Sequence, residues 1–297
     1  MLRTLNSKPN KYLLIILFIT SFFVALIFYF LNNINNSNNL LNNLENSLTT
    51  TKNLFEEQKR YALSLAILLS EDKEIINSFQ SQNRQESFEV INRKIKSLKQ
   101  LQNSSFEVQI HNKNLTTYLR SWDINIKDVP LASFRQGLVK VKETLKPVVS
   151  IELGKRLNIK AISAIIKNGK YIGSIEAIIN FEYLSTELKN KGYKLFVLLN
   201  KKYLNIANEL KNNDEISNYV LVNNTNIDYL EGLNLNSLED YGYVSNKNFS
   251  FAYFSYYDLQ NNHLGYIFTG IKNNKHININ NSFDYETVNI NSEVKIK

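Results

Sequence analysis

The chain has 297 residues, and its 43% hydrophobic content with 17 Tyr and 17 Phe is enough to build a core, which excludes wholesale disorder. Lys and Arg outnumber Asp and Glu by 35 to 27, a net charge of +8, but the basic residues are scattered and lack the interleaved aromatic residues of a nucleic-acid surface. The absence of cysteine excludes disulfides, thiolate metal sites and cysteine nucleophiles. Because the basic residues are scattered, we expect no nucleic-acid partner.

The apolar stretch YLLIILFITSFFVALIFYF, residues 12–30, predicts a transmembrane helix. At about 1.5 Å per residue it would cover about 28 Å, close to the roughly 30 Å of a bilayer's hydrocarbon core. Arg3, Lys8 and Lys11 precede it and no charge follows before Glu45, so the positive-inside rule places the N-terminus in the cytoplasm and the remainder outside. A cleaved signal peptide is the less favoured alternative, because the apolar run is long and no small-residue cleavage site follows it. The assignment is a cytoplasmic tail over 1–11 and a single membrane helix over 12–31.

Residues 38–81 predict one long helix without Gly or Pro. Along a 3–4 repeat from position 41 to position 79, nine of twelve residues are apolar. That seam fits either a partner helix in a dimer or the helix's own domain, and both alternatives stay open. A second helix is predicted over 84–101, and together these helices form a stalk region, 32–105.

From residue 106 the apolar period changes to two, which predicts strands. The clearest hairpin is the KNGK turn between two isoleucine-rich runs. A second set of four or five strands in a meander follows from residue 193. The fold class is therefore α+β, with two tandem modules that each pack an antiparallel sheet against helices. The expected segments are strands at 105–114, 116–122 and 148–154, helices at 131–145 and 182–190, a first module at 106–191, a second module at 192–271, and a polar tail at 272–297.

Catalytic signatures are missing from the sequence: it has no G-x-S-x-G, H-E-x-x-H, phosphate-loop or dinucleotide-binding pattern. Three histidines leave a multi-histidine metal site little to draw on. Glu152 and Glu176, on neighbouring predicted strands, are the one candidate acid/base pair, but two strand carboxylates beside lysines are usually surface charges. We therefore predict a protein that is not an enzyme and needs no cofactor or metal.

The stretch VQIHNKNLTTYLRSWD, residues 108–123, gathers the only tryptophan and one of three histidines. Arginine offers a planar fork to a carboxylate, and tryptophan offers a stacking wall. Such a cluster predicts a site for a small anionic or zwitterionic molecule. The alternative is that Arg120 and Arg135 pair with nearby carboxylates, including Asp123, and bind no ligand. The candidate residues from the pattern are His111, Arg120, Trp122, Arg135, Glu152, Lys160 and Glu176.

These motifs resemble the double Cache (dCache, PAS-like) sensor domains of bacterial chemoreceptors, sensor kinases and diguanylate cyclases. The resemblance covers about residues 35–271 and is strongest over 108–181, where a histidine, R-x-W, F-R, a G-x-E-x-G-like turn and G-x-Y-x-G-S-x-E follow in order. It implies two PAS-like modules with the ligand in the membrane-distal one, the first. The matching residues are His111, Arg120, Trp122, Phe134, Arg135, Glu152, Gly154, Tyr171, Gly173, Ser174 and Glu176.

Some positions depart from the family pattern. Lys160 stands near a position where arginine is common, and lysine keeps the charge but loses the bidentate fork. Ser150 stands where the family often has glycine, Leu157 replaces another glycine, and Ala164 lies near a usual proline. The resemblance therefore does not carry over the identity of a ligand.

The resemblance implies a sensor anchored in the bacterial inner membrane with its sensor domain in the periplasm. Arg120 and Arg135 would bind a ligand carboxylate, Trp122 would wall the pocket, and Glu152 or Glu176 would bind an amine or hydroxyl. Family members usually return through a second membrane helix to a cytoplasmic output domain, which we expect this chain to lack. We therefore expect it to act as a homodimer through a separate chemoreceptor, sensor kinase or other membrane signalling protein. The alternatives are a ligand-free envelope scaffold of the same fold and the remnant of a truncated chemoreceptor.

Overall fold

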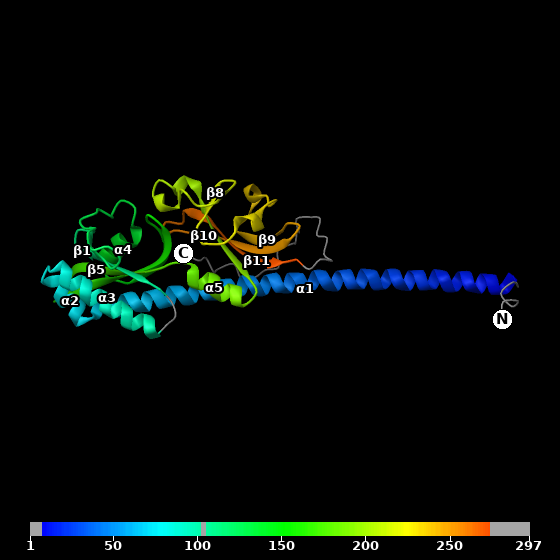
Figure 1. Ribbon diagram of the computed structural model, residues 1–297, viewed down its shortest axis with the longest axis horizontal. Coiled ribbons are helices and arrows are strands. Elements are labelled where there is room, and N and C mark those ends of the chain that lie inside the picture. Colours follow the sequence, from blue (N-terminus) through cyan, green and yellow to red (C-terminus); the bar gives the residue numbers. More distant parts are fainter. Residues whose placement is uncertain (1–7, 102–104, 274–297) are drawn as a thin grey trace.

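A single helix, α1 (Lys8–Glu71), organises the molecule in the computed structural model, which describes residues 8–101 and 105–273. Its N-terminal part projects alone, and its C-terminal part lies along two antiparallel sheets (Figure 1). The predicted α+β class is confirmed. Residues 1–7 of the predicted N-tail and 274–297 of the predicted polar tail lie outside the described residues.

The projecting part of α1 contains the predicted membrane span. Its most apolar window has a mean hydropathy of 2.8, and none of that window is buried against the rest of the described chain. The prediction of one helix over 38–81 is wrong at its end, because Asp72 interrupts it with an extended backbone. The Asp72 carboxylate accepts hydrogen bonds from the N–H groups of Glu74 and Ile75, at 2.9 and 3.1 Å, and so caps a new helix, α2 (Lys73–Gln80).

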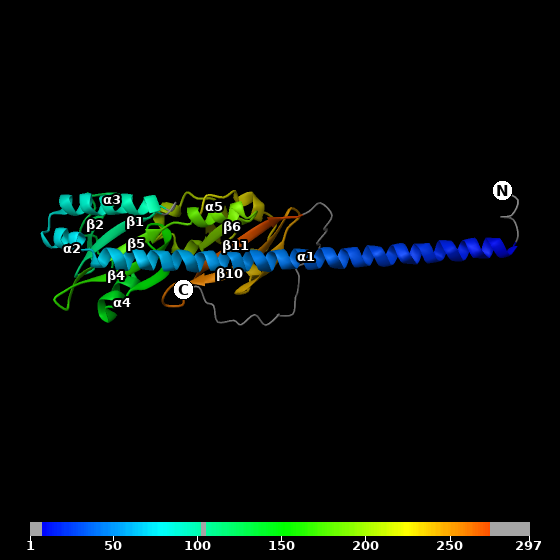
Figure 2. The ribbon, with the colours of Figure 1, turned by 90° about the horizontal axis from the view of Figure 1, so that it is seen from below.

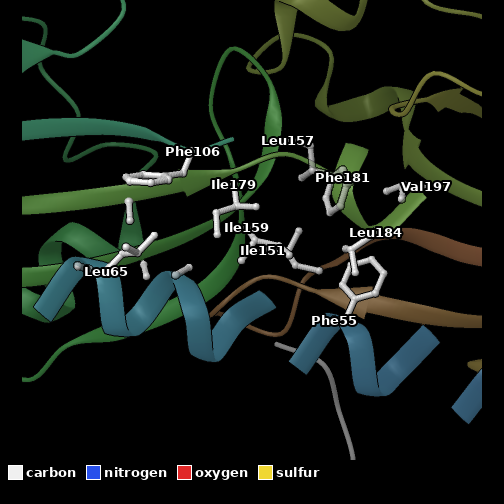
Figure 3. Packing of buried hydrophobic residues seen from close by; sticks show 14 of the residues in the cluster. Phe55, Leu65, Phe106, Ile151, Leu157, Ile159, Ile179, Phe181, Leu184 and Val197 are labelled. Atoms are coloured by element: carbon white, nitrogen blue, oxygen red, sulfur yellow. The ribbon is translucent and has the colours of Figure 1, made fainter. Parts of the chain in front are cut away.

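The apolar seam of α1 packs against the chain's own two sheets (Figure 2). The Thr51 and Thr269 hydroxyls lie 2.6 Å apart at the second sheet, and Ser70 donates a 2.9 Å hydrogen bond to Ser163 in the first. Figure 3 shows Phe55 near Phe181, at the junction of the two sheets. Of the two alternatives for the seam, packing on its own domain is the one observed. Its buried members include Leu44, Leu48, Phe55, Ala62, Leu65 and Leu69.

The first sheet has five strands in the order β2–β1–β5–β4–β3, all antiparallel. The KNGK turn is the predicted two-residue hairpin loop, with positive φ at Asn168 and Gly169. Two of the helices have the predicted bounds, whereas the helix expected over 131–145 is shorter. The strands are β1 (Glu107–Asn112), β2 (Thr117–Arg120), β3 (Val148–Leu153), β4 (Leu157–Lys167) and β5 (Lys170–Ile179), and the helices are α3 (Arg84–Leu101), α4 (Gln136–Thr144) and α5 (Glu182–Asn190).

The two faces of this sheet differ in chemistry. Alternating residues such as Ile110, Ile159 and Ile175 point to α1 and form the main core. The opposite face carries polar residues and lies under the connection between β2 and β3, residues 121–147, which contains α4 and which we call the covering segment. The polar face and the covering segment enclose the candidate site.

The second sheet has six strands in the order β7–β8–β6–β11–β10–β9. The predicted meander is wrong, because β6 lies between β8 and β11 and two short strands were not expected. The outer face of this sheet is filled by a second core of aromatic side chains that includes Phe196, Phe251 and Phe268. The strands are β6 (Lys194–Asn200), β7 (Glu215–Ile216), β8 (Tyr219–Leu221), β9 (Tyr241–Ser245), β10 (Phe249–Tyr257) and β11 (His263–Lys272), and the short 3₁₀ helices are η2 (Lys201–Tyr203), η3 (Asn208–Leu210), η4 (Ile227–Leu230) and η5 (Leu235–Ser237).

Candidate ligand-binding site

The strand register of the first sheet brings the predicted polar residues to one face. His111 on β1 lies opposite Ser174 on β5, and Gln109 lies opposite Glu176. Because every second residue of a strand points the same way, His111 and Glu176 share the face that the covering segment covers. On β3 and β4, Ser150 pairs with Lys160 and Glu152 with Asn158, which adds Glu152 and Lys160 to the same face.

Arg135, at the N-cap position of α4, is the centre of a buried charge cluster. Its Nε donates a 3.0 Å hydrogen bond to Glu152 Oε2, and its Nη2 donates to Glu176 Oε1. All three side chains are buried. The expectation that Glu152 and Glu176 are surface charges is therefore wrong. Internal pairing of Arg135, one of the two alternatives for the cluster, is observed.

Glu152 also caps α4 from the sheet below. Its Oε1 accepts hydrogen bonds from the N–H of Gly137, at 3.0 Å, and from the Ser150 hydroxyl, at 3.1 Å. A carboxylate at a helix N-terminus satisfies a free N–H group and interacts well with the helix dipole. One side chain therefore fixes both Arg135 and the start of the helix that covers the site.

Replacing Gly137 with alanine is expected to lower the free energy of unfolding by about 1–3 kcal/mol, the usual cost of overpacking a tight contact. An added Cβ would lie 2.3 Å from Glu152 Oε1 and 2.9 Å from Ile162 Cδ1. Denaturant unfolding of the full chain measures the loss. Lys140→Ala, on the exposed face of the same helix, is the control and should change the stability by less than about 0.5 kcal/mol. Equal effects of the two substitutions would show that the Gly137–Glu152 contact is loose.

His111 and Glu176 leave two buried polar atoms unsatisfied beside each other. His111 Nδ1 is 3.1 Å from the Ser174 hydroxyl, and His111 Nε2 is 3.5 Å from Glu176 Oε2. Neither Nε2 nor Oε2 has a hydrogen-bond partner in the described part of the chain. Burial lowers the pKa of His111 despite the nearby Glu176, so its ring is neutral at pH 7. Burial opposes ionisation of Glu176, but the charge of Arg135 outweighs it and holds the pKa of Glu176 far below its usual value.

Lys160 is the second buried cation of the site. Its Nζ donates a 3.1 Å hydrogen bond to the backbone oxygen of Leu153, and it forms no ion pair within the described residues. Burial lowers the pKa of Lys160 to about 7, helped by Arg135 and opposed by Glu176 and Glu152. Near neutral pH this amine is therefore partly uncharged.

Arg120 lies at the edge of the cluster. Its Nε donates a 3.2 Å hydrogen bond to Gln109 Oε1, and among the described residues it forms an ion pair neither with Asp123 nor with another carboxylate. Trp122 stays outside the buried cluster: it is 40% exposed, with the guanidinium of Arg120 over its ring at 5.6 Å and that of Arg156 at 6.0 Å. Within the described chain, Arg120 is therefore the arginine of the site without a carboxylate partner.

Tyr171 lies on the α4 side of the same face, in the small core under that helix. Its hydroxyl is buried and has no hydrogen-bond partner among residues 8–101 and 105–273. Burial raises the pKa of Tyr171, which keeps this hydroxyl protonated. The structure thus brings His111, Arg135, Glu152, Lys160 and Glu176 together, with Arg120, Trp122 and Tyr171 around them.

Two residues that support the cluster and its cover were not predicted from the sequence. Gln109 lies two residues before His111, so strand alternation alone could have placed it on the same face. Arg84, at the start of α3, connects β2 to the covering segment: it donates to the backbone oxygens of Tyr118 in β2, at 2.9 Å, and of Ile126 in the covering segment, at 3.2 Å. An arginine that binds only backbone carbonyls leaves no signal in the sequence. In the described chain no group of three or more His, Cys, Asp or Glu could hold a metal ion.

Comparison with known proteins identifies the architecture. The family model dCache_3, described as the double sensory domain of two-component sensor kinases, matches residues 37–269. The structure is also similar to the sensor domain of the V. cholerae histidine kinase DctB, at 12% identity and a TM-score of 0.49, covering 79% of this chain and 98% of that one. It is similar to the ligand-binding domain of the Campylobacter jejuni chemoreceptor Tlp3 in complex with L-valine, at 17% identity and a TM-score of 0.48, covering 81% and 95%. No curated protein matches the sequence.

Proposed function

The chain belongs to the dCache_3 family of double sensory domains, and from this membership we propose that its first sheet binds a zwitterionic small molecule beneath the covering segment. Membership makes the two-sheet region an extracytoplasmic small-molecule sensor domain, a binding module rather than a catalytic one.

The observation that carries the proposal is the unsatisfied oxygen of Glu176. Glu176 Oε2 is buried, ionised and without a hydrogen-bond partner in the described chain, which suits an ammonium group. Arg120 lies on the same face, two strands away across Gln109, and its guanidinium is not ion-paired among the described residues. A small α-amino acid, or a similar zwitterion, would place its ammonium on Glu176 and its carboxylate on Arg120.

Arg135 has a different role in this arrangement from the one expected from sequence. Because its guanidinium is occupied by Glu152 and Glu176, it holds the carboxylates in place and does not bind the ligand. Lys160, His111 and Tyr171 complete the polar wall, and Trp122 lies at its rim.

The signal would leave the site along α1. This helix packs on the first sheet, then on the second, and continues unbroken into the apolar segment. A homodimer would then use the outward face of α1, where Asn46, Asn53 and Arg60 are exposed, because the apolar seam is already occupied. A partner chemoreceptor or kinase would meet the same helix at or within the membrane.

Arg120→Ala is expected to weaken binding of a zwitterionic ligand by about 1.5–3 kcal/mol, the range for a charge-assisted hydrogen bond. The full chain in detergent is first screened by thermal unfolding against the L-amino acids, organic acids and amines. A compound at about 100 times its Kd stabilises the protein by about 2.7 kcal/mol. Any compound that shifts the melting temperature is then titrated calorimetrically into wild type, Arg120→Ala and the surface control Arg93→Ala. Unchanged affinity in Arg120→Ala would exclude Arg120 as the carboxylate anchor.

Because Arg135 is already paired with Glu152 and Glu176, one other function is favoured, that of a ligand-free envelope scaffold of the same fold. In that case the cluster only stabilises the first sheet, and no compound in the screen changes the melting temperature. A well-folded protein that gives a flat screen would therefore support the scaffold over the sensor.

A further inference from the structure

The turn between β3 and β4 contacts both the candidate site and the second sheet. On the site side, Lys160 Nζ donates to the backbone oxygen of Leu153, and a Cβ at Gly154 would come within 2.7 Å of Lys160 Nζ. On the other side, the N–H of Glu209, in η3, donates a 3.0 Å hydrogen bond to the backbone oxygen of Lys155. The turn is therefore held between a buried lysine of the site and the second module.

Arg156, the last residue of this turn, makes a second connection between the same two regions. Its Nη2 is 2.5 Å from Glu107 Oε2, and its Nε is 3.5 Å from Glu209 Oε2. Its guanidinium also lies over the Trp122 ring, whose other cation is Arg120. Two separate paths thus meet in this turn and continue to Glu209: one runs from Lys160 through the turn's backbone, and the other runs from Arg120 and Trp122 through the side chain of Arg156.

We propose that Arg156 is the residue through which occupancy of the site reaches the second module, with Trp122 as its sensor at the rim of the site. This inference rests on the proposed ligand function, because Arg120 is the group that a ligand carboxylate would draw away from Trp122. Movement of Arg120 changes the stacking on Trp122, and Arg156 then redistributes between the ring, Glu107 and Glu209. We call Arg156 with its contacts Trp122, Glu107 and Glu209 the outer joint. It would transmit the state of the site in addition to the signal along α1.

The ion pairs of Arg156 with Glu107 and Glu209 are weak enough to change partners. The side chains of Arg156, Glu107 and Glu209 are 38%, 32% and 50% exposed, so each ion pair is weak and can exchange partners without unfolding either sheet. The cluster around Arg135, by contrast, is buried and rigidly paired. Because these ion pairs are weak, a second arrangement of Arg156 would differ little in free energy, and a ligand with a modest preference for one arrangement would shift the population between them.

The test is a double-mutant cycle between Glu209 and Arg156, read at Trp122. Trp122 is the only tryptophan, so the emission of the full chain in detergent reports this position alone. Glu209→Gln keeps the size of the side chain and the backbone hydrogen bond but removes the charge. We expect it to alter Trp122 emission and to speed hydrogen exchange in the first part of the covering segment, residues 121–135, by about two- to fivefold, as the loss of an exposed ion pair would. In an Arg156→Ala background the same substitution should have no effect.

The matched control is Glu215→Gln, in the same module. Glu215 is a similarly exposed glutamate, at 45%, whose ion pair within the described residues is with Lys201 and not with Arg156. Identical spectra and exchange for Glu209→Gln and Glu215→Gln would overturn the proposal, as would equal effects of Glu209→Gln with and without Arg156. The cycle is run without any small molecule. A failure to find a ligand in the thermal screen can therefore be distinguished from the absence of coupling between Glu209 and Trp122.

Discussion

Arg135→Ala is expected to lower the free energy of unfolding by about 3–5 kcal/mol, because it leaves two buried carboxylates without their cation. Glu152 and Glu176 are 5% and 0% exposed, and each accepts a hydrogen bond from Arg135. The α4 cap should weaken as well, since Glu152 would no longer be held. Denaturant unfolding of the full chain in detergent, followed by circular dichroism and by Trp122 emission, measures the loss.

The pH dependence of this variant tests the cause. In the wild type the pKa of Glu176 is far below its usual value, so the unfolded state binds more protons than the folded state in mildly acidic solution, and stability falls as the pH falls. Without Arg135, burial instead disfavours the ionised form, and the folded state takes up protons more readily. The difference between wild type and Arg135→Ala should therefore shrink between pH 7 and pH 5.

Arg93→Ala is the matched control for the loss of an arginine–glutamate pair. Arg93 pairs with Glu74 on the surface, with side chains 57% and 47% exposed, and its removal should cost less than about 1 kcal/mol. A loss for Arg135→Ala no larger than that of Arg93→Ala would mean that water reaches the cluster and that the site is open without a ligand.

Local signals were enough to predict most of the first module. The bounds of α3 and α5 follow from apolar periodicity, and the β4–β5 hairpin follows from an Asn-Gly turn that needs positive φ at both positions. The break at Asp72 was missed because the apolar repeat continues through it at Ile76 and Phe79. The cap at Asp72 is a local signal that competes with that repeat, and Asp followed by Glu in the first turn could have indicated it.

The second module was harder to predict because its topology depends on long-range pairing. β7 has only two residues, and β9 is a partly exposed edge strand that pairs with β10 alone, so neither shows a strong alternation. The central place of β6 arises from its pairing with both β8 and β11, 19 or more residues away. No local pattern fixes such a choice.

The clustering of these polar residues could be predicted from the sequence, but the pairing of their side chains could not. The charged and aromatic residues on neighbouring predicted strands indicated His111, Arg135, Glu152, Lys160 and Glu176, and the structure gathers all five on one face of the first sheet. Which carboxylate meets which cation depends on the β3–β4 and β1–β5 registers and on where α4 begins. The contact between Gly137 and Glu152, 15 residues apart, follows from helix and sheet packing rather than from spacing.

The buried cluster lies in a low-dielectric interior, whereas the outer joint around Arg156 lies at the surface in contact with water. Inside, unpaired charges are costly, so Arg135, Glu152 and Glu176 stay fixed and preserve the shape of the site. At the rim, water screens Arg120, Arg156 and their partners, so their contacts can change at little cost. Lys160 lies between the two: it is buried like the first group, but no carboxylate of the described residues forms an ion pair with it.

At pH 6, Lys160→Met is expected to raise the free energy of unfolding, because it removes the cost of burying a charged amine, up to roughly 4–5 kcal/mol. The lost hydrogen bond to Leu153 reduces this gain by about 1 kcal/mol. Burial lowers the pKa of Lys160 to about 7 from 10.5 in the unfolded chain. The unfolded state therefore binds more protons than the folded state between about pH 7 and pH 10.5, and wild-type stability gains from this group as the pH rises through that range. Below pH 7 the charged amine is present in both states and the full penalty remains, so the advantage of methionine is largest there and declines above it.

Denaturant unfolding of wild type and Lys160→Met from pH 6 to pH 9 gives the difference that isolates this lysine, because all other titrating groups are common to both proteins. Lys155→Met, an exposed lysine five residues away, is the control and should show a difference near zero at every pH. A constant difference for Lys160→Met would mean that the amine stays charged in the fold, with Glu152 and Glu176 fully compensating its burial. A difference that declines above pH 7 would instead show that the folded protein does not compensate the burial of the Lys160 charge. This lysine lies next to the turn that contains Arg156.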